Sequence, residues 1–179
     1  MNSVATTFRC PADPTITVWR YIIRGINGEG WGYLLLASDG YFSAVSDYGN
    51  YAFRWTAIGE GRDFRDFLAH IGTDYLISKI APEKRYDGGL TEKHVRQLID
   101  EQVASGLLAE QDKKRELDLL RQQSGLENEF HFYEWMNRTD LVFEYQDIFE
   151  TSHNGDAFNF CNKLFPRFAA VLRAELAGP

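Results

Sequence analysis

The spacing of apolar residues changes about a third of the way along the chain. Before that point, short segments rich in β-branched and aromatic residues are separated by glycine-bearing turns such as Asn27-Gly28 and Asp39-Gly40, which is typical of strands joined by hairpins. The strands are predicted at residues 15–26, 31–37, 41–46 and 51–56. Connections this short cannot serve as parallel crossovers, so we predict an antiparallel sheet of about four strands.

After the last predicted strand the apolar period lengthens to that of helices. Residues 64–71 have apolar side chains at i, i+3, i+4 and i+7, which predicts a helix capped by Asp63 and ended by Gly72. A short helix from Asp74 to Ile80 is expected to follow.

Two further helices are expected to form a charged helical hairpin. The first begins at Thr91, with Leu90 and Val95 as a hydrophobic staple, and ends near Gly106. The second covers residues 109–123, which have good helix formers but a thin apolar stripe.

The last third of the chain mixes two patterns. Residues 127–150 interleave aromatic and acidic residues without a clear period, so neither helix nor strand is predicted there. Residues 158–176 have apolar residues at helical spacing, which predicts a pair of terminal helices or one kinked helix. Pro166 fits the first turn of the second helical segment.

Together these elements predict an α+β fold, in which an N-terminal antiparallel sheet packs with helices and is followed by a helical hairpin and C-terminal helices. The expected parts are residues 1–82 for the sheet and its helices, 83–125 for the hairpin, and 126–179 for an acidic aromatic segment and a C-terminal helix that packs back on the sheet. A length of 179 residues favours one compact domain overall.

Composition and charge narrow the classes of function. Aromatic residues make up 15% of the chain, which argues against global disorder. The net charge is −7, so a broad basic surface for nucleic acid is not expected. The sequence has neither a long apolar run nor an N-terminal signal pattern, which predicts a cytoplasmic protein that does not bind a membrane.

Acidic residues are concentrated in one segment. Residues 127–156 carry eight acidic side chains and one basic side chain, Arg138. Carboxylates among aromatic residues can occupy a groove built for nucleic acid, although a solvated acidic face is the commoner explanation. The candidate partner-binding residues here are Glu127, Glu129, Glu134, Glu144, Asp147 and Glu150.

A second candidate is the aromatic stretch of residues 46–55. One interpretation is a hairpin whose aromatic side chains fill one face of the sheet. The other is an exposed aromatic platform that stacks on a base or a peptide side chain with a cation beside it. The second interpretation adds Tyr48, Tyr51, Arg54 and Trp55 to the candidate partner-binding residues.

No motif predicts a catalytic, metal or cofactor site. The glycines of residues 25–32 precede a strand rather than a helix, so a hairpin turn explains them better than a phosphate loop. His131 and His153 lie in the acidic segment, but no zinc-ligand spacing is present, and we expect no metal ion or cofactor. Cys10 and Cys161 are expected to be free thiols, with Cys161 buried on a helix.

The two ends of the chain resemble a family of small proteins from bacteriophages and prophages. The resemblance covers roughly residues 20–80 and 157–177, and residues 83–123 do not align. It is carried by Gly30-Trp31-Gly32, residues 38–55 (SDGYFSAVSDYGNYAFRW), residues 63–67 and residues 165–176 (FPRFAAVLRAEL). The resemblance implies the cytoplasm of a bacterial host and a phage accessory role, and it implies no catalytic residue.

We therefore expect a non-catalytic phage or prophage accessory protein that binds a host or phage protein. A nucleic-acid-binding complex is one such partner, and direct binding of nucleic acid is not expected. The more specific hypothesis is an inhibitor of a host defence complex, of the anti-CRISPR type. Two alternatives stay open: a small hydrolase or nucleotide-modifying enzyme with a carboxylate/His site, which predicts acids and histidine converging in a cleft, and a homo-oligomeric structural protein.

Overall fold

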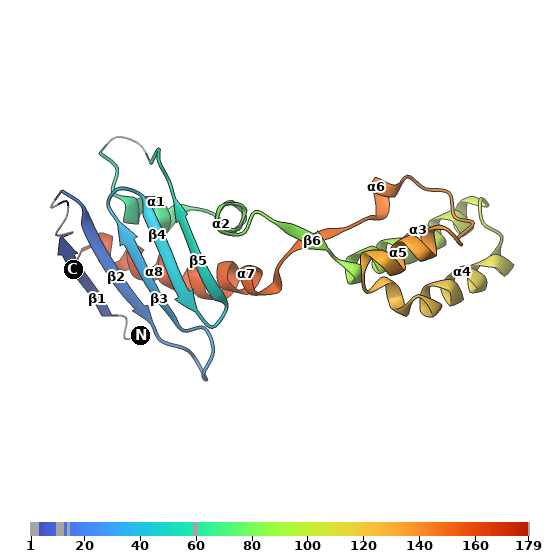
Figure 1. Cartoon of the computed structure of the whole chain (residues 1–179), viewed down its shortest axis with the longest axis horizontal. Coiled ribbons are helices and arrows are strands. Elements are labelled where there is room, and N and C mark those ends of the chain that lie inside the picture. The colour runs from blue at the N-terminus through green and yellow to red at the C-terminus, as the bar shows by residue number, and fades with distance from the viewer. Residues whose placement is uncertain (1–3, 10–12, 14, 59–60, 179) are drawn as a thin grey trace. The chain divides into compact units, whose positions relative to one another are not determined.

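The chain forms two units, each with its own core. The structure is a computed structural model and describes residues 4–9, 13, 15–58 and 61–178 (Figure 1). The first unit contains the described residues up to Glu83 together with those from His153 onward, and the second is Lys84–Ser152. The chain passes between the units through β6 (Lys84–Tyr86) and β7 (Thr151–His153), which pair in a two-stranded sheet.

The first unit is built around a five-stranded antiparallel sheet, which confirms the predicted arrangement. Neighbouring strands follow chain order: β1 (Val4–Arg9), β2 (Thr17–Ile23), β3 (Gly32–Ala37), β4 (Tyr41–Ser46) and β5 (Gly49–Arg54). The last four correspond to the predicted strands. β1 is an additional edge strand that pairs along β2, from Val4 opposite Ile22 to Arg9 opposite Thr17.

The turn between β2 and β3 accounts for the glycine-rich stretch. Asn27 and Gly28 have φ values of 54° and 89°, which a two-residue turn needs if its twist is to match that of the flanking strands. Ile26 and Glu29 close the turn with reciprocal backbone hydrogen bonds of 2.7 and 3.1 Å. The stretch is therefore a hairpin turn, as predicted.

Helices from two separate parts of the chain cover one face of this sheet (Figure 1). They are α1 (Phe64–His70), α2 (Thr73–Ile80), α7 (Gly155–Asn159), a π-helical turn (Phe160–Leu164) and α8 (Phe165–Leu176). Pro166 lies in the first turn of α8, as predicted. The inward side chains of the strands meet the helices in a core that includes Tyr21, Leu34, Phe42, Phe165 and Phe168.

The caps of α1 and α2 differ in part from those predicted. Asp63 does cap α1, because its carboxylate accepts the backbone N–H of Arg65 at 2.8 Å. The predicted end at Gly72 is wrong, since Ile71 already has an extended backbone and ends the helix. Gly72 is instead the residue before α2, and Asp74 lies within the first turn of that helix rather than at its cap.

Arg65 joins α1 to α8 and to the sheet. Its guanidinium pairs with Asp63 at 2.6 Å and with Glu175 at 2.8 Å, and it lies 4.6 Å from the ring centroid of Trp19. The Tyr21 hydroxyl donates to Glu175 at 2.9 Å. The hydrogen bond from Arg65 lowers the pKa of Asp63, and burial raises the pKa of Tyr21. This network fixes both helices on the sheet.

Gly30 links the first turn to two distant segments. Its N–H donates to Asp47 at 2.6 Å, and its carbonyl accepts from Arg167 of α8 at 2.7 Å. Gly30 has a φ of 73°, and a Cβ at this position would lie 2.8 Å from Arg167 Nη1. The positive φ therefore favours glycine here, and a Cβ would displace the guanidinium of Arg167.

The second unit is mostly helical. It contains α3 (Gly88–Ser105), α4 (Glu110–Gln122), a 3₁₀ turn (Ser124–Leu126), α5 (Glu129–Met136) and α6 (Tyr145–Ile148). α3 and α4 pack together as the predicted helical hairpin, and α3 ends at Gly106, which has a left-handed backbone. The core of this unit includes Val95, Ile99, Leu120, Phe132 and Trp135. None of the described helices is long and apolar enough to cross a lipid bilayer.

The predicted start of α3 at Thr91 is wrong. Asp87 caps the helix by accepting the N–H of Leu90 at 3.0 Å, so Gly88 lies inside the first turn. Gly88 fits there because it packs so closely that a Cβ would lie 2.2 Å from the carbonyl oxygen of Leu126. Thr91 is fully buried within the helix, and Leu90 is exposed and forms no staple.

Cys161 is a free, fully buried thiol, and burial raises its pKa to about 12. Cys10 lies outside the described residues. At pH 8 we expect iodoacetamide to alkylate Cys161 at least about 100-fold more slowly in the native protein than in urea. Burial keeps the thiol protonated and shields it from the reagent. Peptide mass spectrometry measures Cys161 separately from Cys10. Similar rates in the two states would contradict the burial of this thiol.

Candidate functional site

The candidate partner-binding residues fall into two groups. Four of them, Tyr48, Tyr51, Arg54 and Trp55, belong to the first unit. The six acidic candidates, Glu127, Glu129, Glu134, Glu144, Asp147 and Glu150, belong to the second unit. Each group is described within its own unit.

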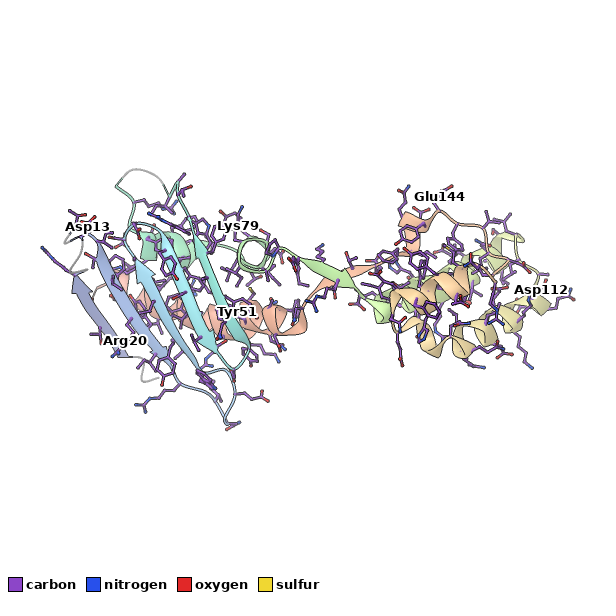
Figure 2. All side chains as sticks on the ribbon, viewed as in Figure 1. Asp13, Arg20, Tyr51, Lys79, Asp112 and Glu144 are labelled. Atoms are coloured by element: carbon purple, nitrogen blue, oxygen red, sulfur yellow. The ribbon has the colours of Figure 1, made fainter. Side chains whose placement is uncertain are left out.

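In the first unit, the aromatic candidates face the helices. Trp55 is buried, and its Nε1 donates to the hydroxyl of Tyr75 on α2 at 3.1 Å. Tyr51 (labelled in Figure 2) packs on Phe160, with ring centroids 4.7 Å apart, and its hydroxyl donates to the carbonyl of Tyr48 at 2.6 Å. These rings fill the covered face of the sheet.

Arg54 lies on the opposite face of β5. It occupies an exposed position that alternates with the inward side chain of Phe53, and it pairs with Asp39 at 2.9 Å. The structure therefore does not bring Arg54 together with the rings of Tyr51 and Trp55.

In the second unit, the acidic candidates follow α5 and α6. Glu127 and Glu129 flank Asn128, whose side chain caps α5 by accepting the N–H of His131 at 3.0 Å. Glu134 is exposed one turn further along α5. Glu144 (labelled in Figure 2) immediately precedes α6, Asp147 lies within it, and Glu150 follows it.

An aromatic cluster joins α5 to α6. Phe132 is fully buried at its centre. The centroid of its ring lies 5.5 to 6.1 Å from those of Tyr86, Tyr133, Trp135, Tyr145 and Phe149. Aromatic pairs at such distances stabilise a fold beyond simple burial. The cluster therefore sets the position of α6 against α5.

Part of this cluster reaches the surface. The rings of Tyr133 and Tyr145 are stacked, with centroids 6.1 Å apart and planes 9° apart, and they are 43% and 39% exposed. Phe130, one turn earlier on α5, is 68% exposed. Burial raises the pKa of Tyr145 to about 12, helped by the hydroxyl of Tyr133 and the charge of Glu129. The phenol of Tyr145 therefore stays neutral at physiological pH.

Exposed carboxylates lie on the same two chain segments as these rings. Among the described residues, none of the exposed side chains of Glu127, Glu129, Glu134, Glu144 and Asp147 forms an ion pair, whereas Glu150 pairs with His94 at 3.0 Å. The unit carries 15 acidic and 9 basic side chains, so it holds −6 of the net charge of −7. We call these residues the α5–α6 surface: Glu127, Glu129, Phe130, Tyr133, Glu134, Glu144, Tyr145 and Asp147.

Buried polar side chains hold the segment that leads into this surface. The amide of Gln102 donates to the carbonyl of Val142 and accepts its N–H at 3.2 Å. Glu116 accepts the hydroxyl of Thr139 at 2.6 Å and, more weakly, the N–H of Asp140 at 3.4 Å. Further along, the hydroxyl of Thr91 accepts the N–H of Glu150 at 3.1 Å.

Sequence reasoning missed Thr91, Gln102 and Glu116 as anchors. A signal was present, because each lies on the apolar stripe of its helix. Gln102 follows Val95 and Ile99 at helical spacing, and Glu116 precedes Leu119 and Leu120 in the same way. A polar residue on an apolar stripe needs a buried partner, although the sequence does not show which one.

Nothing in the described part of the chain forms a cluster of three or more His, Cys, Asp or Glu side chains that could hold a metal ion. His131 contacts the side-chain amide of Asn128, and His153 in the first unit contacts the carbonyl of Ala81 at 2.9 Å. A surface cavity of about 350 Å³ lies next to α6 and is lined by His94, Gln97, Leu98, Glu101, Asp147 and Ile148.

Comparison with known proteins identifies the family. No curated protein and no solved structure matches the chain significantly. The model of a phage family, Phage_phiTE_072, matches residues 14–174. Because this match includes most of the sheet, the helical hairpin and the terminal helices, the chain belongs to this phage family.

Proposed function

We propose that this phage protein acts without catalysis, by binding a basic protein of the host or phage through the α5–α6 surface. The observation that carries the proposal is the set of exposed carboxylates, without ion pairs to the described residues, on the two segments that carry the stacked rings of Tyr133 and Tyr145. Lysine and arginine side chains are attracted by such carboxylates, and an arginine guanidinium also stacks on exposed aromatic rings.

The chemistry of the surface suits one class of partner in particular. Proteins that bind nucleic acid carry clustered lysine and arginine side chains, which neutralise phosphates. An acidic and aromatic surface competes for the same side chains. The finer form of the proposal is therefore an inhibitor that occupies the nucleic-acid groove of a host defence complex, of the anti-CRISPR type.

A pull-down from the bacterial host followed by mass spectrometry identifies the partner, and charge reversal then tests the surface. We expect Glu129→Lys/Glu134→Lys to slow association with that partner by at least about tenfold at low salt, because electrostatic steering raises association rates by about 10–1,000-fold. The effect should shrink as salt rises, since the Debye length falls to about 8 Å at physiological ionic strength. Stopped-flow or surface-binding kinetics measure both effects.

A matched variant separates local charge from net charge. Glu101→Lys/Glu110→Lys changes two exposed carboxylates of α3 and α4 in the same unit, and it alters the net charge by the same amount. We expect this variant to associate within about threefold of the wild type, because charges away from the contact surface are screened and steer the partner less. Equal slowing by both pairs, or no slowing by either, would contradict the proposed surface.

A further inference from the structure

The sheet of the first unit has a second face that no described helix of that unit covers (Figure 1). Side chains on this face alternate with the buried ones along β2 to β5. We call it the open sheet face: Val18, Arg20, Ile22, Tyr33, Leu35, Tyr41, Ser43, Val45, Asn50, Ala52 and Arg54.

This face is unusually apolar for one exposed to solvent. Tyr33 and Val45 are 51% and 50% exposed, and Leu35 and Tyr41 are exposed as well. Ile22, Tyr33 and Val45 lie opposite one another on adjacent strands and form a continuous apolar row. A solvated face of an antiparallel sheet normally has polar side chains at these positions, so this row is suited to contact with another surface.

The charges of the open sheet face have one sign. Its two ionisable side chains other than tyrosine are Arg20 and Arg54, and no carboxylate belongs to it. Arg54 is neutralised in part by Asp39 from the neighbouring turn. Arg20 (labelled in Figure 2) is exposed next to Leu35 and forms no ion pair with the described residues. An occupant of this face must therefore supply apolar side chains and carboxylates.

We infer that the occupant is the second unit of another copy of this chain, docked through α5. This helix has Phe130, Tyr133 and Glu134 exposed at i, i+3 and i+4, so one stripe offers both aromatic contact and a carboxylate for Arg20. A helix laid on a sheet face is the ordinary way in which these elements bury their apolar surfaces. A second open sheet face fits less well, because it offers no carboxylate to Arg20.

Such a contact is head-to-tail, because a sheet face of one copy meets the second unit of the next. Two copies joined by one such contact still have one unused surface of each kind, so the copies form a ring if these surfaces meet and an open chain if they do not. The inference rests on the same α5–α6 surface as the proposed function, and binding of a basic partner competes with self-association. The open sheet face itself has no part in binding that partner.

Sedimentation velocity as a function of protein and salt concentration tests the inference. The wild type is expected to form larger species as its concentration rises toward about 1 mM, and less so at high salt. Arg20→Glu and Glu129→Lys/Glu134→Lys should each raise the dissociation constant for self-association by at least about tenfold. Arg85→Glu, an exposed change of equal charge on β6, should leave that constant within about threefold of the wild-type value.

Mixing Arg20→Glu with Glu129→Lys/Glu134→Lys is the decisive step. Each retains the surface that the other lacks, so the mixture should recover association while neither variant associates alone. Tyr33→Ser provides a second disruption of the sheet face, and circular dichroism verifies that each variant is folded. A wild type that stays monomeric throughout, or a sheet-face variant that associates normally, would overturn the inference. The proposed function is judged separately, because Arg20→Glu should still bind the partner found by pull-down.

Discussion

Phe132→Ala is expected to lower the free energy of unfolding of the second unit by about 3–5 kcal/mol, the range for removing a buried phenylalanine ring. Phe132 is fully buried and lies against five other aromatic rings, two of which, Tyr133 and Tyr145, extend to the surface. Its removal leaves a cavity and takes away the central member of the ring contacts. Urea unfolding followed by tryptophan fluorescence measures the loss, with Trp135 as a neighbouring reporter.

Phe130→Ala is the matched control on the same helix. Phe130 is largely exposed, so we expect a change in stability within about 0.5 kcal/mol. The same substitution should weaken partner binding, because exposed aromatic side chains are frequent anchors of interfaces. Equal destabilisation by both substitutions would contradict the division of this helix into a core side and a binding side.

Gln102→Leu is expected to lower the free energy of unfolding of the second unit by about 1–3 kcal/mol, although the new side chain is apolar and similar in size. The amide of Gln102 satisfies both the N–H and the carbonyl of Val142. Leucine leaves both backbone groups of the exposed Val142 without these partners, and each lost hydrogen bond costs about 0.5–1.5 kcal/mol. Urea unfolding compared with Gln97→Leu, an exposed position on the same helix, isolates this effect, and we expect the control to change stability by less than about 0.5 kcal/mol.

The same variant links stability to function. Residues 139–144 form no helix or strand, so their position depends on side chains from α3 and α4. Loosening them should displace Tyr145 and lower affinity for the partner, although Gln102 does not belong to the α5–α6 surface. Partner affinity unchanged in a destabilised Gln102→Leu would show that this segment does not position the binding residues.

Local sequence was sufficient for much of the first unit. Strands β2 to β5 alternate inward and outward side chains, and the turns between them carry glycine where φ is positive, so both signals lie within a few neighbouring residues. Asp63 was predictable as a cap for the same reason, because the backbone N–H that its carboxylate accepts belongs to Arg65, only two residues later. The helical hairpin followed from propensity and from Gly106 at the end of α3.

Other features depended on contacts between residues far apart in the chain. The edge strand β1 has little apolar pattern of its own and is defined by its pairing with β2. The sequence placed the start of α3 too late because Asp87-Gly88-Gly89 is a typical turn sequence. In the structure Gly88 lies inside the helix, where its lack of a side chain lets Leu126 pack closely against it.

The candidate site shows the same division between local pattern and distant contact. Sequence alone located the acidic and aromatic composition of residues 127–150, but it did not separate exposed rings from buried ones, because no period was present. Tertiary structure decided that Phe132 is central and Phe130 exposed, and that Gln102 and Glu116 hold the irregular segment. The physical reason is that a buried polar group or ring is specified by its partner, and these partners lie more than ten residues away.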